Sequence, residues 1–312
     1  MNRLGPATGR ERLAIRRWLI LSCLVALGCP TSDDDSADGD DDTAAVQGPW
    51  KTVSAGMYHT CATDHDDHVY CWGDDTFGQS WVPDLLGDAY PTINAGDNHN
   101  CALSPDGVVA CWGDNQSGQL MVPPGDYRQV EGGGFHTCGV VEGGDGVCWG
   151  DDYWGQLDVP DGVEFATIGS GRTHSCGIDV DGGLHCWGDN SRSQLDHPNI
   201  ESQHLSVGST HNCAIDEFGT TWCWGTYGEL DTTPPDEEFI SVSQYYHLCG
   251  ITADQRIVCW GEVKPEDCLE SPEGEFRSLS VGFQHACAIT TDDEMVCWGK
   301  NIKGQLDVPE IG

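Results

Sequence analysis

From residue 50 onward, short segments rich in strand-forming residues alternate with turns rich in glycine and aspartate. Asp-Gly pairs such as Asp106-Gly107 separate these segments, which include Tyr127–Glu131, His99–Leu103, Val108–Trp112 and Gln119–Val122. No segment keeps the 3.6-residue period of an amphipathic helix. The pattern therefore predicts an all-β domain made of many short strands.

One unit recurs seven times between residues 50 and 312. It reads apolar-x-x-Gly-x-x-His-x-Cys, continues with Cys-Trp-Gly, and often ends in Gly-Gln-Leu-x-x-Pro. A period of about 38 residues with about four short strands per unit is typical of a β-propeller blade. The sequence thus predicts a seven-bladed β-propeller, in which Trp50–Ala55 completes the last blade and closes the ring.

The unit HTCATDHDDHVYCWGDDTFGQ at residues 59–79, together with NHNCALSPDGVVACWGDNQSGQL at 98–120, resembles the RCC1 repeat in its cysteine-bearing bacterial form. The resemblance covers residues 50–312 and implies a seven-bladed β-propeller. The functions of the resembling family differ: nucleotide exchange on a small GTPase, chromatin binding, and inhibition of secreted β-lactamases. The resemblance therefore indicates a fold and leaves the function open.

The two cysteines of each unit stand ten residues apart on either side of a predicted hairpin. Opposite residues of an antiparallel pair have Cα atoms about 4.5–5.5 Å apart, which is within disulfide range. The tryptophan beside each second cysteine points to the other side of its strand, so we expect it to pack between blades. We predict seven disulfides: Cys61–Cys71, Cys101–Cys111, Cys138–Cys148, Cys176–Cys186, Cys213–Cys223, Cys249–Cys259 and Cys287–Cys297. Cys268 is left over.

Each first cysteine follows a histidine by two positions, which places both side chains on one strand face. A His-Cys-Cys set could bind zinc, but an oxidising compartment consumes the thiols. We therefore expect a half-buried histidine that bonds to a neighbouring strand; in the resembling family it is a consensus position. Turns such as Asp74-Asp75 and Asp151-Asp152 could bind calcium, although aspartate is also an ordinary turn former. We expect no metal and no cofactor.

The first 28 residues have the pattern of a secretory signal peptide, with a basic head and the apolar run WLILSCLVALG. The run ends in Ala26-Leu27-Gly28-Cys29, which resembles a bacterial lipobox. We predict a lipoprotein-type signal peptide at 1–28, a lipid anchor on Cys29, and a disordered, aspartate-rich tether over 29–49. Ordinary cleavage nearby, which would leave a periplasmic or secreted protein, is the alternative.

The chain of 312 residues carries 51 acidic and 14 basic side chains, a net charge of -37. This charge argues against nucleic acid as a partner and favours a basic one. Seventeen cysteines in such a chain suggest an exported protein. No nucleophile motif, phosphate loop or catalytic triad occurs, so we predict no catalytic residues.

The residues that vary between repeats are the candidates for partner binding, because the framework repeats and the loops differ. They include the pairs between Gly and His, such as Asp97-Asn98 and Arg172-Thr173. Unit six reads Gln244-Tyr245-Tyr246 there, which we take to be one residue longer. Aromatic residues without a framework role suit an interface: Tyr58, Phe77, Phe135, Tyr153, Trp154, Tyr227, Tyr245, Tyr246 and Phe283.

The preferred hypothesis is a monomeric, non-catalytic binding propeller. It would be displayed as a lipoprotein at the outer membrane or cell surface, and would touch the membrane only through its anchor. There it would hold a protein or an envelope polymer. One alternative is a secreted inhibitor of an extracellular enzyme, and another is an enzyme, such as a lyase or hydrolase, on a propeller scaffold.

Overall fold

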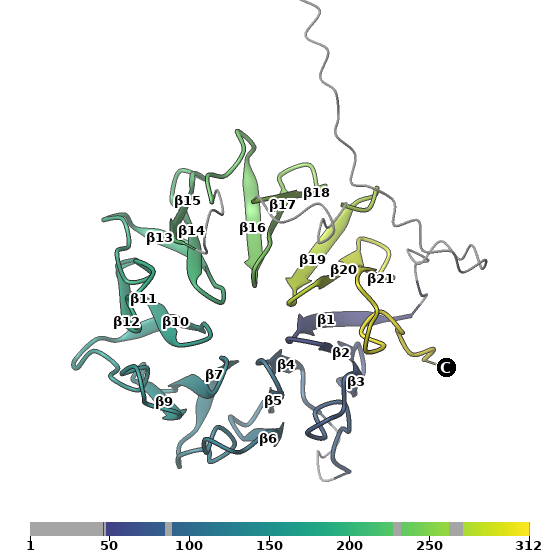
Figure 1. Cartoon of the computed structure of the whole chain (residues 1–312), viewed down its shortest axis with the longest axis horizontal. Coiled ribbons are helices and arrows are strands. Elements are labelled where there is room, and N and C mark those ends of the chain that lie inside the picture. The colour runs from purple at the N-terminus through teal and green to yellow at the C-terminus, as the bar shows by residue number, and fades with distance from the viewer. Residues whose placement is uncertain (1–45, 47, 85–88, 227–231, 262–270, 312) are drawn as a thin grey trace, which may run out of the picture.

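A computed structural model describes residues 46, 48–84, 89–226, 232–261 and 271–311. These residues form seven three-stranded antiparallel sheets and no helix, and the sheets stand as blades around a central axis (Figure 1). The predicted all-β, seven-bladed propeller is thereby confirmed. The predicted signal peptide, Cys29, most of the tether, Tyr227 and Cys268 lie outside the described residues.

In each blade the first strand lies nearest the axis and the third lies at the outer edge (Figure 1). Blade 1 comprises β1 (Trp50–Ala55), β2 (His59–Asp64) and β3 (Val69–Gly73). The others are β4 (Thr92–Ala95), β5 (His99–Leu103), β6 (Val109–Gly113); β7 (Tyr127–Gly132), β8 (His136–Val141), β9 (Gly146–Gly150); β10 (Phe165–Ser170), β11 (His174–Asp179), β12 (Leu184–Gly188); β13 (Ser202–Val207), β14 (His211–Asp216), β15 (Thr221–Gly225); β16 (Phe239–Gln244), β17 (Leu248–Thr252), β18 (Ile257–Trp260); and β19 (Phe276–Val281), β20 (His285–Thr290), β21 (Met295–Gly299).

Two details of the predicted blade are wrong. Gln119–Val122, expected to be a fourth strand, starts in a turn. The Gln119 carbonyl accepts hydrogen bonds from Trp149 Nε1 and Thr137 Oγ1 of the next blade, both at 2.9 Å, so this segment connects blades instead of extending a sheet. Trp50–Ala55, expected to complete the last blade, pairs with β2 as the inner strand of blade 1.

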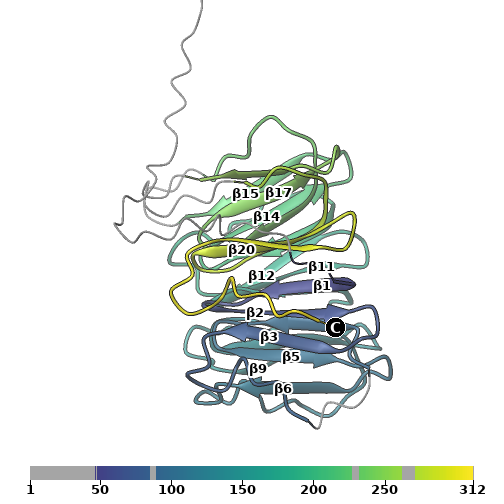
Figure 2. The same cartoon turned by 90° about the vertical axis from the view of Figure 1, so that its right-hand side faces the viewer.

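The ring closes through segments near both ends of the described chain. Val46 forms an antiparallel bridge with Met295 of β21, with N–O distances of 2.8 and 3.0 Å. At the other end, the Gln305 carbonyl accepts a hydrogen bond from Trp72 Nε1 at 2.9 Å. The C-terminal segment lies beside blade 1 (Figures 1 and 2), where the apolar cluster around Trp50 includes Leu306, Val308 and Ile311.

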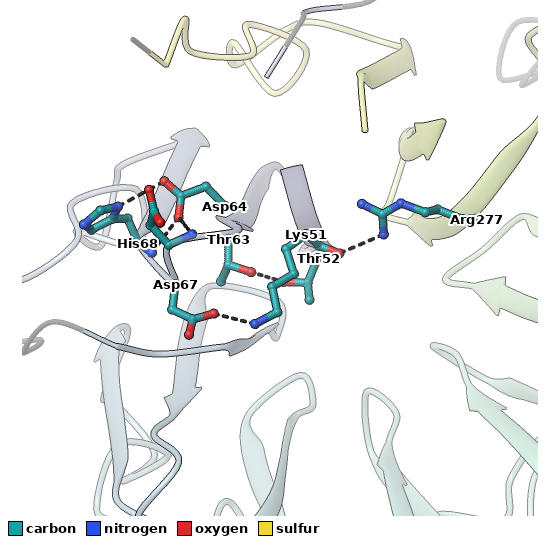
Figure 3. A network of polar contacts seen from close by, with 8 residues as sticks. Lys51, Thr52, Thr63, Asp64, Asp67, His68 and Arg277 are labelled. Atoms are coloured by element: carbon teal, nitrogen blue, oxygen red, sulfur yellow. Dashed lines mark hydrogen bonds and ion pairs between the residues drawn. The ribbon is translucent and has the colours of Figure 1, made fainter. Parts of the chain in front are cut away.

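Polar contacts strengthen the junction between blades 7 and 1 (Figure 3). The Arg277 guanidinium of β19 donates to the backbone carbonyl of Lys51 and also to that of Trp50. The Lys51 ammonium in turn forms an ion pair with Asp67, which follows β2. The first strand of the propeller is therefore held on one side by its own blade and on the other by the last blade.

All seven predicted disulfides are present. Their cysteines are directly opposite each other on the second and third strands of each blade, with Cα–Cα distances of 4.0 to 4.1 Å. Each disulfide lies in an apolar layer with the tryptophan of the next blade: Cys61 with Trp112, and Cys138 with Trp187. The layers between blades therefore combine a cross-link from one blade with an aromatic ring from the next.

The repeated histidines are buried, not half-buried as expected, because the neighbouring blade covers them. In five of them Nε2 lies 2.7 to 2.9 Å from a side-chain oxygen on the middle strand of the next blade: His59–Asn100, His99–Thr137, His136–Ser175, His174–Asn212 and His285–Thr60. Burial lowers the pKa of these histidines to about 3 or about 4. The predicted bond to a neighbouring strand is thus a bond between blades.

Candidate functional site

Two sets of variable loops lie at the same end of the propeller. The register pairs His59 with Gly73, so the segment between the first two strands lies beside the segment that follows Trp-Gly. Backbone hydrogen bonds join the two, as from Asp74 N to Tyr58 O at 2.8 Å and from Asp151 N to Phe135 O at 2.9 Å. We call this end the loop face, and the opposite end, where turns join the second and third strands, the hairpin face. All described candidate aromatics belong to loop-face segments.

The segments after Trp-Gly are fixed by a repeated set of hydrogen bonds. In blade 3, Gln156 Oε1 accepts the backbone N–H of Trp154 at 2.7 Å, and Gln156 Nε2 donates to Asp151 Oδ2 at 2.8 Å. Asp152 Oδ1 accepts the backbone N–H of Leu157. Blade 1 repeats this arrangement with Gln79. The aspartate oxygens that could have suggested calcium therefore cap the turn, which holds its tip in one conformation.

The tips of these segments display apolar side chains to solvent. Tyr153 is 79% and Trp154 is 49% exposed, and their ring centroids lie 5.0 Å apart in an edge-on arrangement. Phe77, also predicted, is exposed as well. The prediction missed three further exposed residues in the same segments, Trp81, Met121 and Ile302. Their position after Trp-Gly was the sequence signal that could have identified them. Together they form what we call the rim arc, on the consecutive blades 7, 1, 2 and 3: Ile302, Phe77, Trp81, Met121, Tyr153 and Trp154.

The remaining described candidates come together through contacts between loops of different blades. Phe283 has its ring centroid 5.3 Å from that of Tyr58 and 5.1 Å from that of Tyr246. Tyr245 lies 5.2 Å from Tyr246 by the same measure. Phe135 joins the group through a cation–π contact, because the Arg172 guanidinium carbon lies 6.0 Å from the centroid of its ring. These residues, with Asp97 and Arg172, are called the axial cluster below.

Asp97 and Arg172 are the polar members that the aromatic criterion missed. Tyr245 donates its hydroxyl to Asp97 Oδ1 at 2.5 Å, and Arg172 Nε lies 3.8 Å from Asp97 Oδ2. Arg172 Nη1 also donates to the Tyr246 hydroxyl at 3.1 Å. Burial raises the pKa of Asp97, although Tyr245 and Arg172 oppose the change. Burial, followed by the charge of Asp97, raises the pKa of Tyr245 well above its ordinary value.

These contacts join blades 2, 4 and 6, which are not neighbours in the ring, so the network spans the axis. The blade 6 loop differs from the prediction: Ser243 stands opposite Cys249, whereas Ser206 stands opposite Cys213, so this loop is one residue shorter and not longer. An axial cavity of about 510 Å³ is lined by the inner strands, and also by Asp97, Arg172 and Tyr245. The axial cluster therefore contributes part of the wall of this cavity.

The described residues contain no group of three or more His, Cys, Asp or Glu side chains placed to hold a metal ion. They also contain no helix that is long and apolar enough to span a membrane. What the loop face offers is exposed aromatic surface on fixed turns, and a half-buried guanidinium among aromatic rings. Tyrosine, tryptophan, phenylalanine, methionine and arginine are the residues enriched at protein interfaces.

Comparison with known proteins agrees with this architecture. The Regulator of chromosome condensation (RCC1) repeat matches residues 50–79, 92–119, 165–194 and 276–305. The chain is therefore a seven-bladed propeller that carries RCC1 repeats, and this confirms the resemblance found in the sequence. RCC1-like propellers commonly mediate protein interactions. A search of curated proteins found no match.

Among solved structures, the chain is similar to two plant receptor ectodomains. The ectodomain of the Physcomitrella patens receptor kinase CR4 is 24% identical with a TM-score of 0.69, over 81% of this chain and 75% of that one. The CRINKLY WD40 ectodomain of the Arabidopsis thaliana receptor kinase ACR4 is 25% identical with a TM-score of 0.69, over 84% and 98%. Yeast RCC1 (Prp20), in a structure with Kap60, is 18% identical with a TM-score of 0.51, over 84% and 72%.

Proposed function

We propose that this protein is a non-catalytic binding propeller, displayed at a bacterial cell envelope, that holds a protein or an envelope polymer on its loop face. The observation that carries the proposal is the rim arc. Its aromatic side chains are exposed, yet the turns that present them are fixed by the framework of the repeat. A loop whose backbone is already fixed loses little conformational entropy on association, which favours affinity.

The disulfides and the similarity to receptor ectodomains support an exported protein. Seven structural disulfides form and persist in oxidising compartments and are rare in the cytosol. Within this proposal, Cys29 carries the lipid and the acidic segment 29–49 holds the propeller away from the membrane. Mass analysis of the mature chain tests the anchor, since lipidated Cys29 and simple cleavage give different masses.

The net charge of -37 favours a basic partner and would speed its capture. Binding of such a partner weakens as salt is added, because screening reduces attraction between separated charges. The yeast RCC1 propeller, which shares this fold, was solved with the protein Kap60. A protein partner therefore agrees with the use of the fold in yeast RCC1.

The test is capture of partners from envelope fractions and culture fluid by the mature protein. Replacement of Tyr153 and Trp154 by alanine should remove most of the captured partner. Phe218→Ala is the matched control, since Phe218 is 82% exposed but follows β14 at the hairpin face. Equal capture by both variants and the wild type would contradict a role for the rim arc. Tight, stoichiometric capture of a hydrolase that loses its activity would favour the inhibitor alternative.

A further inference from the structure

Equivalent residues of the seven inner strands form a ring around the axis, and one blade differs from the others in the charge of its residue. On each inner strand, the residue paired with the first disulfide cysteine belongs to this ring: Ser54, Asn94, Glu131, Gly169, Ser206, Ser243 and Ser280. Among these equivalent positions Glu131 of blade 3 is the acid, and the others are neutral. In a repeat protein, a single charged residue at a position that is uncharged in every other blade points away from a framework role.

Four neutral members of the ring share a structural task. The side-chain oxygen of each accepts the backbone N–H of the inner strand in the next blade, at 2.6 to 3.0 Å: Ser54 from Ala95, Asn94 from Gly132, Ser243 from Val281 and Ser280 from Ala55. Glu131 does not make this bond to blade 4 among the described contacts. Its oxygens instead accept the side-chain amides of Asn94 and Gln129. The framework therefore does not require an acid at this position.

Glu131 lines the axial cavity of about 510 Å³, a volume typical of sites for small molecules. The next blade contributes Gly169 at the equivalent position, which brings no polar side chain toward Glu131, and Val207 occupies the space where a Cβ of Gly169 would lie. Ser170 and Ser209 line the same cavity, and their hydroxyl oxygens have no hydrogen-bond partner among the described residues. Ser209 is 1% exposed. Unused buried hydroxyls are costly unless a water or a ligand bonds to them.

The cavity also lacks a counter-charge for Glu131. None of the lysines and arginines in the described ranges forms an ion pair with it, while Arg172, at the same cavity, is engaged by Asp97 and Tyr246. Burial raises the pKa of Glu131 to about 7, and the two amide donors offset this effect only in part. A cation that enters the cavity would supply the opposite charge that the protein does not provide.

We propose that the axial cavity binds a small organic cation with a primary ammonium group, such as a short alkyl diamine, through the carboxylate of Glu131. An ammonium group has three donors and no acceptor, which suits a carboxylate together with hydroxyl oxygens. Ser170 and Ser209 provide such oxygens on the same cavity wall. The site is separate from the rim arc, so the proposal does not depend on the partner of the loop face.

Calorimetric titration of the oxidised, mature protein with 1,4-diaminobutane tests the proposal. We expect one molecule to bind per propeller, and we expect no binding of 1,4-butanediol, which has the same length without the charge. Absence of diamine binding, or equal binding of the diol, would overturn the proposal. Lysine side chains carry the same group, so tighter binding of N-acetyl-lysine amide would assign the site to a lysine of a partner protein.

Two variants identify the residue responsible. Glu131→Ser introduces the side chain that blades 1, 5, 6 and 7 use, so it should fold normally while affinity falls at least about tenfold, the size of one hydrogen bond to a charged group. Glu131→Gln preserves the side-chain length and should lose affinity to the same extent, which keeps a readout if the serine variant does not fold. Glu142→Ser is the control, because it removes the same charge from an exposed turn of the same blade. An equal loss of affinity in Glu142→Ser would show that the diamine is held by general attraction to an acidic surface and not by Glu131.

Discussion

At the scale of single residues, glycine decides how closely the blades approach each other at the axis. A Cβ atom added to Gly96 would lie 2.5 Å from the backbone oxygen of Gly133, and one added to Gly133 would lie 2.5 Å from that of Gly171. Gly56, Gly171 and Gly282 meet the next blade in the same way. The contacting atoms belong to the backbone, so they cannot turn aside. These glycines allow the loops between first and second strands to approach one another around the axis.

We predict that Gly96→Ala lowers the free energy of unfolding by roughly 1–3 kcal/mol, the usual cost of forcing extra volume into a packed site. The new methyl group would also lie 2.5 Å from Cε1 of His99. Gly143→Ala is the control, since nothing lies within 4 Å of its added Cβ. Denaturant unfolding monitored by tryptophan fluorescence measures both variants. Equal midpoints for the two would contradict the close approach.

At the scale of elements, the strands and disulfides could be predicted because their causes are local. Cys138 and Cys148 flank one hairpin, and the register of two strands joined by a short turn follows from their spacing. The connector at Gln119–Val122 has strand-like composition but uses its carbonyl for the next blade, so composition alone misassigned it. Asp97 and Arg172 stood among the variable pairs, but the aromatic criterion did not select them, because their role depends on a contact between blades.

We predict that the double variant Cys138→Ala/Cys148→Ala lowers the free energy of unfolding by roughly 2–4 kcal/mol, because the unfolded chain regains freedom that the cross-link had removed. The loss includes packing, since Cys138 lies in the layer that holds Trp187. Guanidinium unfolding of the oxidised variant and wild type gives the difference. Thiol titration of the unreduced variant must first show that the other disulfides are intact. An unchanged unfolding midpoint would argue that this cross-link adds nothing to the folded blade.

At the scale of the whole molecule, the decisive contacts join residues far apart in the chain. Tyr245 and Asp97 are 148 positions apart, and Thr60 bonds to His285 across the closure of the ring. The closure assigned from sequence to Trp50–Ala55 belongs instead to Val46 and to the C-terminal residues around Gln305. No local pattern specifies which end of a ring completes which blade. The number of blades was nevertheless predictable, because each repeat carries its own pattern.

The buried histidines make the stability of the ring depend on pH. His59, His99, His136, His174, His211 and His285 have an ordinary pKa of 6.5, which burial lowers to about 3 or about 4 in the folded protein. Below pH 6.5 the unfolded chain therefore binds protons that the folded protein cannot, and stability falls toward the folded pKa values. Glu131 acts in the opposite direction, because its pKa is raised from 4.5 to about 7. Asp97, whose pKa burial also raises, acts in the same direction as Glu131. These are two groups against six, so the histidines prevail.

We predict that the free energy of unfolding decreases steadily as the pH is lowered from about 6.5 to about 5, a range in which most carboxylates stay ionised in both states. Urea unfolding at a series of pH values measures the slope. His211→Gln removes one titrating group, and its ring nitrogens have no hydrogen-bond partner among the described residues. This variant should reduce the slope by up to about 1.4 kcal/mol per pH unit, the contribution of one proton. Stability that is constant or rises on acidification would mean that the histidines of the ring can be protonated without opening the contacts between blades.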